Sequence, residues 1–244
     1  TEAVQDMIRF LDNVLQFFID YAPDSLSKAR YSAMMQRDLG LGLLGYHTAL
    51  QKMGLPFDSI EAREFNVQIF SHMYEQASES SHKLAVERGS CGDAEEQDLR
   101  IRNSHLLAVA PNANSAINIG VSASIEPIPA NIYVHKTRIG NVTVKNKALE
   151  QRLAELGMNT DDVWDSIKDN EGSVQHLEDL SAHDREVFKT FYEIDQREVV
   201  KQAADRTVYI CQSQSLNLAF PNGVDAEYVN EVHWNAWYKG CKTL

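Results

Sequence analysis

Cysteine, proline and long apolar runs are scarce in this sequence. Its 244 residues include 3 Cys and 6 Pro. The widely spaced Cys91, Cys211 and Cys241 form neither a disulfide framework nor a CxxC metal motif, so we expect a reducing compartment. No stretch approaches the roughly 18 to 20 apolar residues of a membrane span, and no basic signal-peptide segment opens the chain. These absences predict a cytoplasmic protein that does not cross a membrane.

Positive charge is also in deficit. Lys and Arg number 23 against 35 Asp and Glu, which gives a formal net charge of −12. Surfaces that bind nucleic acid or anionic membranes need a broad basic patch, and no run of basic residues supplies one here. We therefore expect no nucleic-acid and no membrane partner, and any bound phosphate must be held locally.

Apolar residues at intervals of three and four predict most of the helices. Cap residues, glycines and prolines set their expected ends. The predicted helices cover Ala3–Ile19, Gly42–Met53, Ile60–Arg88, Lys147–Leu156, Asp161–Ile167, Asp184–Asp205 and a last helix capped by Asp225 that runs through Tyr238, with a loop over Ser90–Asp98.

Two segments have strand character. Leu106–Ala110 is an uninterrupted apolar run that Pro111 stops, which favours a strand buried on both faces. Thr207–Phe220 begins with β-branched and aromatic residues and is predicted as strand and then loop. Strands separated by helices indicate an α/β fold with parallel strands.

No repeat, low-complexity tract or linker divides the chain. We therefore treat 1–244 as a single segment. Within it, a helical amino-terminal part, 1–100, precedes a part with strands and helices, 101–244.

The glycines at positions 40, 42 and 45 spell GxGxxG. A dinucleotide site needs a hydrophobic strand directly before the first glycine, where this chain has the polar segment Gln36–Leu39. We interpret these glycines as small residues that allow close helix packing.

Glu79 and His82 have the ExxH spacing of di-iron carboxylate proteins. Such proteins use two of these motifs and two further glutamates, and only one motif is present. A solvated polar helix face is the preferred interpretation. A helical di-iron protein remains as an alternative that stoichiometric metal would reveal, and we assign no metal ligand.

The segment Pro111–Ala116 follows the expected buried strand. Its Pro-Asn-Ala-Asn-Ser turn, with a helix start at Ala116, would aim unpaired backbone N–H groups and the positive end of a helix at one point. An acidic protein can bind phosphate in this way without lysines. The alternative is an ordinary capping turn that binds only water.

Several motifs resemble the catalytic large subunit of class I ribonucleotide reductase. The resemblance implies part of the ten-stranded α/β barrel, with several peripheral helices, in which a thiyl radical reduces ribonucleoside diphosphates to deoxyribonucleotides. The motifs occur in order over essentially the whole chain, at Arg37–Gly42, Arg102–Ser104, Ala110–Ser115, Gly120–Ser122, Ser124–Pro127, Gly172–Leu177, Phe188–Thr190, Glu193–Arg197, Ala203–Thr207, Gln212–Asn217 and Trp237–Leu244.

The resemblance implies that the same turn binds the substrate diphosphate, mainly through backbone N–H groups and a hydroxyl. Many relatives carry Ser or Thr at positions 112 and 114 and a second hydroxyl residue at position 116, so we expect fewer hydroxyl contacts here. Backbone contacts do not depend on side chains and should remain. The predicted phosphate-binding residues are Pro111, Asn112, Ala113, Asn114, Ser115 and Ala116.

The family's radical machinery is missing from this chain. The resemblance implies a thiyl-radical cysteine in an Asn-x-Cys-x-Glu segment, a reductant cysteine pair, and a tyrosine pair after Lys242–Leu244. The three cysteines present occupy other segments, so we assign no catalytic residue. We expect a carboxyl-proximal fragment that is inactive alone.

The implied partners are the remaining segments of the large subunit, the small subunit with its metal and radical cofactor, a dithiol reductant and a ribonucleoside diphosphate. The complete enzyme would be a homodimer, and no cofactor is expected in this chain itself. The alternative is a noncatalytic remnant that binds nucleotides or a subunit.

Overall fold

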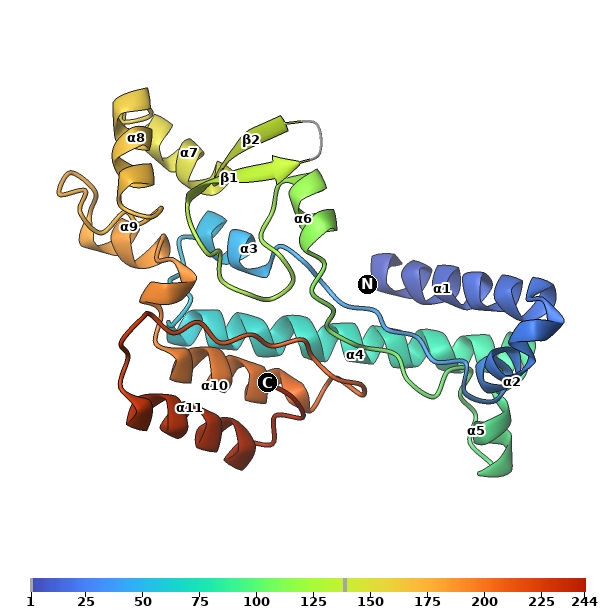
Figure 1. The fold of residues 1–244 in the computed structure, drawn as a ribbon. Coiled ribbons are helices and arrows are strands. Elements are labelled where there is room, and N and C mark those ends of the chain that lie inside the picture. Colours follow the sequence, from blue (N-terminus) through green and yellow to red (C-terminus); the bar gives the residue numbers. More distant parts are fainter. Residues whose placement is uncertain (1, 138–139) are drawn as a thin grey trace.

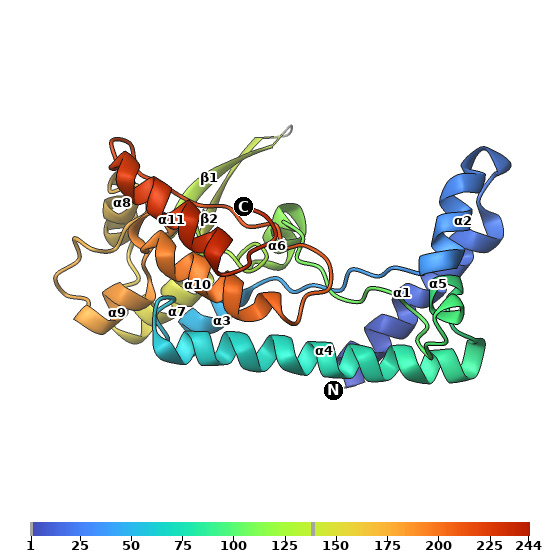
Figure 2. The ribbon, with the colours of Figure 1, turned by 90° about the horizontal axis from the view of Figure 1, so that it is seen from below.

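The longest helix, α4 (Ile60–Arg88), runs along the molecule and joins its two ends (Figures 1 and 2). The computed structural model describes residues 2–137 and 140–244. At one end of α4 lie α1 (Glu2–Tyr21), α2 (Ser27–Gln36) and α5 (Gly92–Glu96). The other elements are η1 (Asp24–Leu26), α3 (Tyr46–Lys52), α6 (Ala113–Ile119), β1 (Ile132–Thr137), β2 (Gly140–Lys145), α7 (Lys147–Glu155), α8 (Asp161–Asp169), α9 (Ala182–Val187), η2 (Phe191–Glu193), α10 (Gln196–Thr207) and α11 (Ala226–Tyr238).

Three extended segments lie side by side and parallel in the middle of the chain's fold. Leu107 pairs with Leu41 on one side, and Val109 pairs with Gln214 on the other. Their backbone hydrogen bonds measure 2.7 to 3.2 Å. The predicted strand Leu106–Ala110 is the central segment of this arrangement, and its pairing is parallel as expected. It pairs through isolated bridges and forms no named strand, and Ala110 is exposed, so the expectation of a strand buried on both faces along its whole length is wrong.

The central segment contacts two separate apolar cores. Leu107 packs with Ile8 and Leu84 beneath α1. Val109 belongs to a second core with Tyr46 and other residues of α3, α4 and α10. Packing from both sides therefore determines where the carboxyl end of this segment lies.

The glycine motif brings extended backbones together. A Cβ added to Gly42 would lie 2.4 Å from the carbonyl oxygen of Ala108. Gly45 has a φ of +82° and is the N-cap of α3. The interpretation of Gly42 as a helix-packing residue is therefore wrong, because α3 begins at Tyr46 and not at Gly42 as predicted.

Most of the other helices are confirmed. The bounds of α4 agree with the prediction, and those of α1, α7, α8 and α11 differ from it by no more than two residues. Ser59, Thr160 and Asp225 each accept a hydrogen bond from a backbone N–H in the first turn of the helix that follows. Side-chain caps of this kind can be recognised in the sequence.

Two predicted segments have a different secondary structure in the fold. Asp184–Asp205 is not one helix, because Thr190 and Glu193 form a capping box that starts η2 between α9 and α10. The strand predicted to open at Thr207 is also wrong, since α10 extends to Thr207 and the paired segment lies further on, at Gln214.

The prediction missed η1, α2, α5, β1 and β2. α2 has no clear apolar periodicity in its sequence, and α5 lies inside the expected loop Ser90–Asp98. β1 and β2 form an antiparallel hairpin whose register runs from Ile132 opposite Lys145 to Thr137 opposite Gly140. In the described part of the chain, no helix has the length and apolar character needed to cross a membrane.

Candidate phosphate-binding turn

The turn Pro111–Ala116 lies at the carboxyl end of the central parallel segment. α6 begins at Ala113, so the helix start predicted at Ala116 is wrong by three residues. Asn112 is the N-cap with a left-handed backbone, φ +52°, and its side chain makes no capping hydrogen bond. The first N–H groups of a helix have no intrahelical acceptor, so this start is open to an external anion.

Most of the turn faces solvent. Ala113, Asn114 and Ser115 are exposed, whereas Ala116 is buried. The N–H of Ala116 donates to the carbonyl oxygen of Asn112 at 3.0 Å and closes the first turn. No acidic residue lies in that turn, so no like charge opposes an anion there.

Contacts with α3 hold the chain just after α6. The N–H of Ser122 donates to Thr48 Oγ1 at 2.8 Å, and the N–H of Thr48 donates to Ser122 Oγ at 3.1 Å. His47 Nδ1 accepts from the N–H of Ile128 at 2.9 Å. Burial lowers the pKa of His47 to about 3, so this acceptor is a neutral imidazole. These positioning residues carry no sequence signal that separates them from ordinary helix residues.

Motifs that are distant in sequence meet around the central segment. Glu126 Oε1 accepts from the Asn217 side chain at 2.6 Å and from its backbone N–H at 3.2 Å. The buried Arg206 donates to Gln214 Oε1 at 2.7 Å. Lys242 Nζ donates to three successive carbonyl oxygens, those of residues 210, 211 and 212. The carboxyl-terminal motif therefore holds the segment that pairs with the central one.

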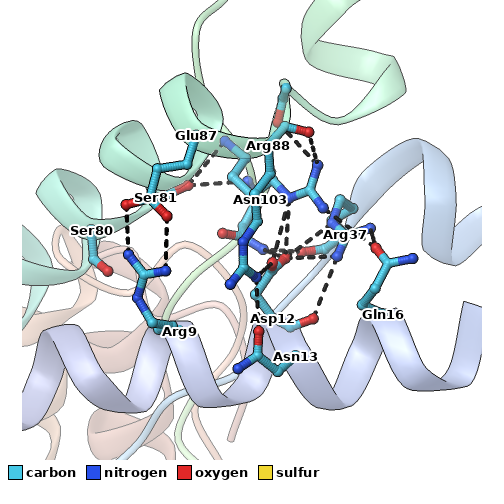
Figure 3. A network of polar contacts seen from close by, with 12 residues as sticks. Arg9, Asp12, Asn13, Gln16, Arg37, Ser80, Ser81, Glu87, Arg88 and Asn103 are labelled. Carbon is cyan, nitrogen blue, oxygen red and sulfur yellow. Dashed lines mark hydrogen bonds and ion pairs between the residues drawn. The ribbon is translucent and has the colours of Figure 1, made fainter.

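A buried carboxylate organises the opposite end of the parallel segments (Figure 3). Asp12 of α1 receives Arg37 Nη2 at 2.8 Å, Arg88 Nη1 at 2.9 Å and Arg102 Nε at 3.4 Å. Asn103 Nδ2 donates to the carbonyl oxygen of Arg37 at 3.0 Å. Burial raises the pKa of Asp12, but the hydrogen bonds from Arg37 and Arg88 and the charges of Arg37 and Arg102 outweigh it, so the pKa lies below its usual value. This cluster ties α1 and α4 to the starts of two parallel segments.

A cavity of about 530 Å³ lies between α6, the β1–β2 hairpin and α7. Of the six residues in the predicted turn, only Ala113 and Ala116 line it. Lys145 of β2 and Lys147 of α7 line the wall of this cavity that the hairpin and α7 form. Lys145 Nζ lies 4.8 Å from the ring centre of Trp164. The exposed face of the turn, with Asn114 and Ser115, is thus separate from this cavity.

Cys211 and the two ExxH residues, Glu79 and His82, contact other groups of the protein itself. Cys211 Sγ accepts from the N–H of Leu106 at 3.0 Å, and burial raises the pKa of Cys241. Glu79 pairs with Lys83, and His82 Nδ1 lies 2.8 Å from the carbonyl oxygen of Arg100. Within residues 2–137 and 140–244, no group of three or more His, Cys, Asp or Glu is placed to hold a metal ion.

The model of the ribonucleotide reductase barrel domain matches residues 1–100 and 93–244. This chain belongs to the ribonucleotide reductase barrel-domain family. The class Id ribonucleotide reductase alpha subunit of Actinobacillus ureae has a similar structure, with a TM-score of 0.90 and 36% identity over 100% of this chain. The fold is therefore that of part of a reductase barrel domain, as the sequence motifs imply.

Viral reductases are also similar to this chain. The provisionally named ribonucleoside-diphosphate reductase large subunit of frog virus 3 is 45% identical over 100% of the chain. The large subunit of invertebrate iridescent virus 3 is 41% identical over 98% of it. The chain spans 43% and 38% of these two proteins and 46% of the Actinobacillus subunit. It thus corresponds to less than half the length of each of these ribonucleotide reductases.

Proposed function

We propose that this chain supplies the substrate phosphate-binding turn of a ribonucleoside-diphosphate reductase large subunit. The observation that carries the proposal is the open helix start at Ala113–Ser115, placed at the carboxyl end of the central parallel segment. Ligand sites in α/β folds commonly lie at the carboxyl ends of strands. Membership of the reductase family supports a diphosphate as the anion.

The backbone provides most of the proposed binding. The N–H groups of residues 113–115 would donate to diphosphate oxygens, and the positive helix end would favour their negative charge. The Ser115 hydroxyl and the Asn114 amide are exposed beside them and can add hydrogen bonds. The turn would thus orient the substrate without a lysine and without moving a proton.

The radical chemistry belongs to other parts of the proposed enzyme. A cysteine in the remaining segments of the large subunit would form the thiyl radical, which a small subunit with a metal and radical cofactor generates. A dithiol would supply the reducing electrons. We propose that the complete large subunit is a homodimer and that nucleic acid is not a partner, in keeping with the net charge of −12.

Hydrogen exchange can test the turn directly. In the reassembled enzyme, a ribonucleoside diphosphate should slow the exchange of the amides of residues 113–115, because each N–H would gain an acceptor. The matching nucleoside without phosphates is the control and should leave them unchanged. Unaltered exchange with the diphosphate under saturating conditions would contradict the site.

A further inference from the structure

α1 carries two separate apolar faces. One face, with Ile8, Leu11 and Leu15, packs in the core beneath α1. The second face points away from this core, and its side chains are 43% to 71% exposed. Its members, which we name the outer α1 stripe, are Met7, Phe10, Val14, Phe17 and Tyr21.

The spacing of the outer α1 stripe is that of a helix-pairing seam. Its residues follow one another at intervals of three, four, three and four, so they form a narrow line along almost the whole helix. The rings of Phe17 and Tyr21 contact each other, with centroids 4.6 Å apart. Isolated exposed apolar residues are common, but a continuous stripe with two such rings marks an interaction surface.

Acidic side chains border the stripe on one side. A rotation of about 100° per residue places Glu2, Asp6 and Asp20 together along that side. All three residues are exposed. A partner that complements this border needs basic residues beside its own apolar line.

A second copy of this chain does not provide that complement. In a parallel pair of α1 helices Asp6 would face Asp6, and in an antiparallel pair it would face the end that holds Asp20. Each copy also carries a net charge of −12, which opposes self-association. The charge pattern therefore favours a different helix as the occupant.

We propose that the outer α1 stripe docks an amphipathic helix from the part of the reductase large subunit that this chain does not contain. That helix would carry apolar residues at three- and four-residue intervals and Lys or Arg beside them. The inference rests on the proposed function, because it assumes the remainder of the subunit as partner. More than half of the length of the similar reductases is available to supply the helix.

Competitive co-purification tests this interface. The tagged part of the frog virus 3 large subunit outside the matched region serves as the probe, and it is co-expressed with two forms of this chain that differ in size. One form is wild type, and the other carries Phe10→Ser and Phe17→Ser. We expect the tagged part to retain the double variant at least about tenfold less than the wild type, since two interface rings lose their burial.

Matched variants separate docking from folding. Ile60→Ser with Val208→Ser changes two apolar residues that are 72% and 76% exposed elsewhere, and it should be retained like the wild type. Phe10→Leu with Phe17→Leu should restore most of the retention. Asp6→Lys with Asp20→Lys should lower it, because the charge complement is reversed. Circular dichroism should show that every variant is folded.

Three results would overturn the proposal. The wild-type chain could fail to bind the tagged part, or the Phe10/Phe17 variant could be retained as well as the wild type. The third is a homodimer of the wild-type chain alone that the Phe10/Phe17 substitutions convert to a monomer, which would identify a second copy as the occupant.

Turnover separates this inference from the proposed function. If the complex assembles through the stripe but reduces no ribonucleoside diphosphate with small subunit and dithiol present, the proposed function fails and the interface stands. If turnover occurs and the Phe10/Phe17 variant assembles normally, the interface fails alone.

Discussion

Asp12 has no exposed surface, and three arginine side chains approach it. A buried ion pair gives little net stability when desolvation is counted, but removal of one partner leaves the others without compensation. Arg37 and Arg102 are both buried, so they cannot turn to water if the carboxylate is lost. The carboxylate of Asp12 is therefore required to keep Arg37 and Arg102 in their buried positions.

We predict that Asp12→Asn lowers the free energy of unfolding by about 3 to 5 kcal/mol, because two buried guanidinium groups lose their counter-charge. Urea unfolding followed by circular dichroism measures the change. Glu87→Gln is the matched control, since the Arg9–Glu87 pair also joins α1 to α4 but is exposed at 42% and 47%. The control should leave the unfolding midpoint nearly unchanged. Equal effects of the two substitutions would contradict the assigned role of Asp12.

His47 gives the fold a specific acid sensitivity. Its pKa in the folded chain is lowered to about 3, and its ordinary value is 6.5. Below pH 6.5 the unfolded chain takes up a proton at this residue and the folded chain does not. Stability from the neutral imidazole is therefore complete above pH 6.5 and is lost as the pH falls toward 3.

We expect His47 to account for a loss of about 2 kcal/mol between pH 7 and pH 5. Unfolding free energies of the wild type and His47→Asn across this range measure it. Asn keeps an acceptor for the N–H of Ile128 but does not titrate, so its curve should be flatter by that amount. Parallel curves for the two proteins would count against a neutral His47 in the fold.

The central parallel segment and the glycine segment form one structural element. Gly42 allows the two backbones to approach, since a side chain at this position would meet the carbonyl oxygen of Ala108. Gly40 differs, because its added Cβ would lie 3.4 Å from the Ala108 side chain, at ordinary contact distance. The requirement for glycine is therefore confined to one of these two neighbouring positions.

Gly42→Ala should destabilise the chain by about 2 kcal/mol or more, because backbone must move to admit the methyl group. Gly40→Ala should change the free energy of unfolding by no more than about 0.5 kcal/mol. Thermal and urea unfolding of both variants test the contrast. Similar losses at both positions would show that the spacing of these segments is not set by Gly42.

α6 shows how one element joins fold and proposed site. The parallel pairing fixes the chain before it, and the reciprocal bonds of Thr48 and Ser122 fix the chain after it. The proposed substrate binding would require no side-chain rearrangement, since the backbone N–H groups already point outward from the helix start. The turn is thus held from both ends while its first residues stay exposed.

The molecule is elongated, with α1, α2, α5 and the core beneath α1 at one end of α4, and with the hairpin and helices α7 to α11 at the other (Figure 2). The outer α1 stripe is exposed, and the sheet formed by β1 and β2 has two strands within the described residues. The parallel segments draw residues from both the amino-terminal part, 1–100, and the part 101–244. In the proposed large subunit, the docked helix would cover the outer α1 stripe.

We predict that the 244-residue chain alone makes no deoxyribonucleotide, even when the small subunit and a dithiol are added. The reason is chemical, since the thiyl-radical cysteine implied by the family motif is not in this sequence. A radiolabelled ribonucleoside diphosphate assay measures the product. Turnover would show that one of Cys91, Cys211 and Cys241 carries the radical.

The amino-acid sequence was sufficient for the bounds of α1, α4, α8 and α11 to within two residues, and it placed an extended segment before Pro111. It did not give the start of α6, which lies at Ala113. Periodicity, caps and stop residues act within a few positions, so they can be recognised locally. Contacts such as those of Asp12 with Arg37, Arg88 and Arg102, or Val109 with Gln214, were not foreseeable because they join residues far apart along the chain. Which distant residues meet depends on how all the elements pack together, and a local pattern carries no information about that packing.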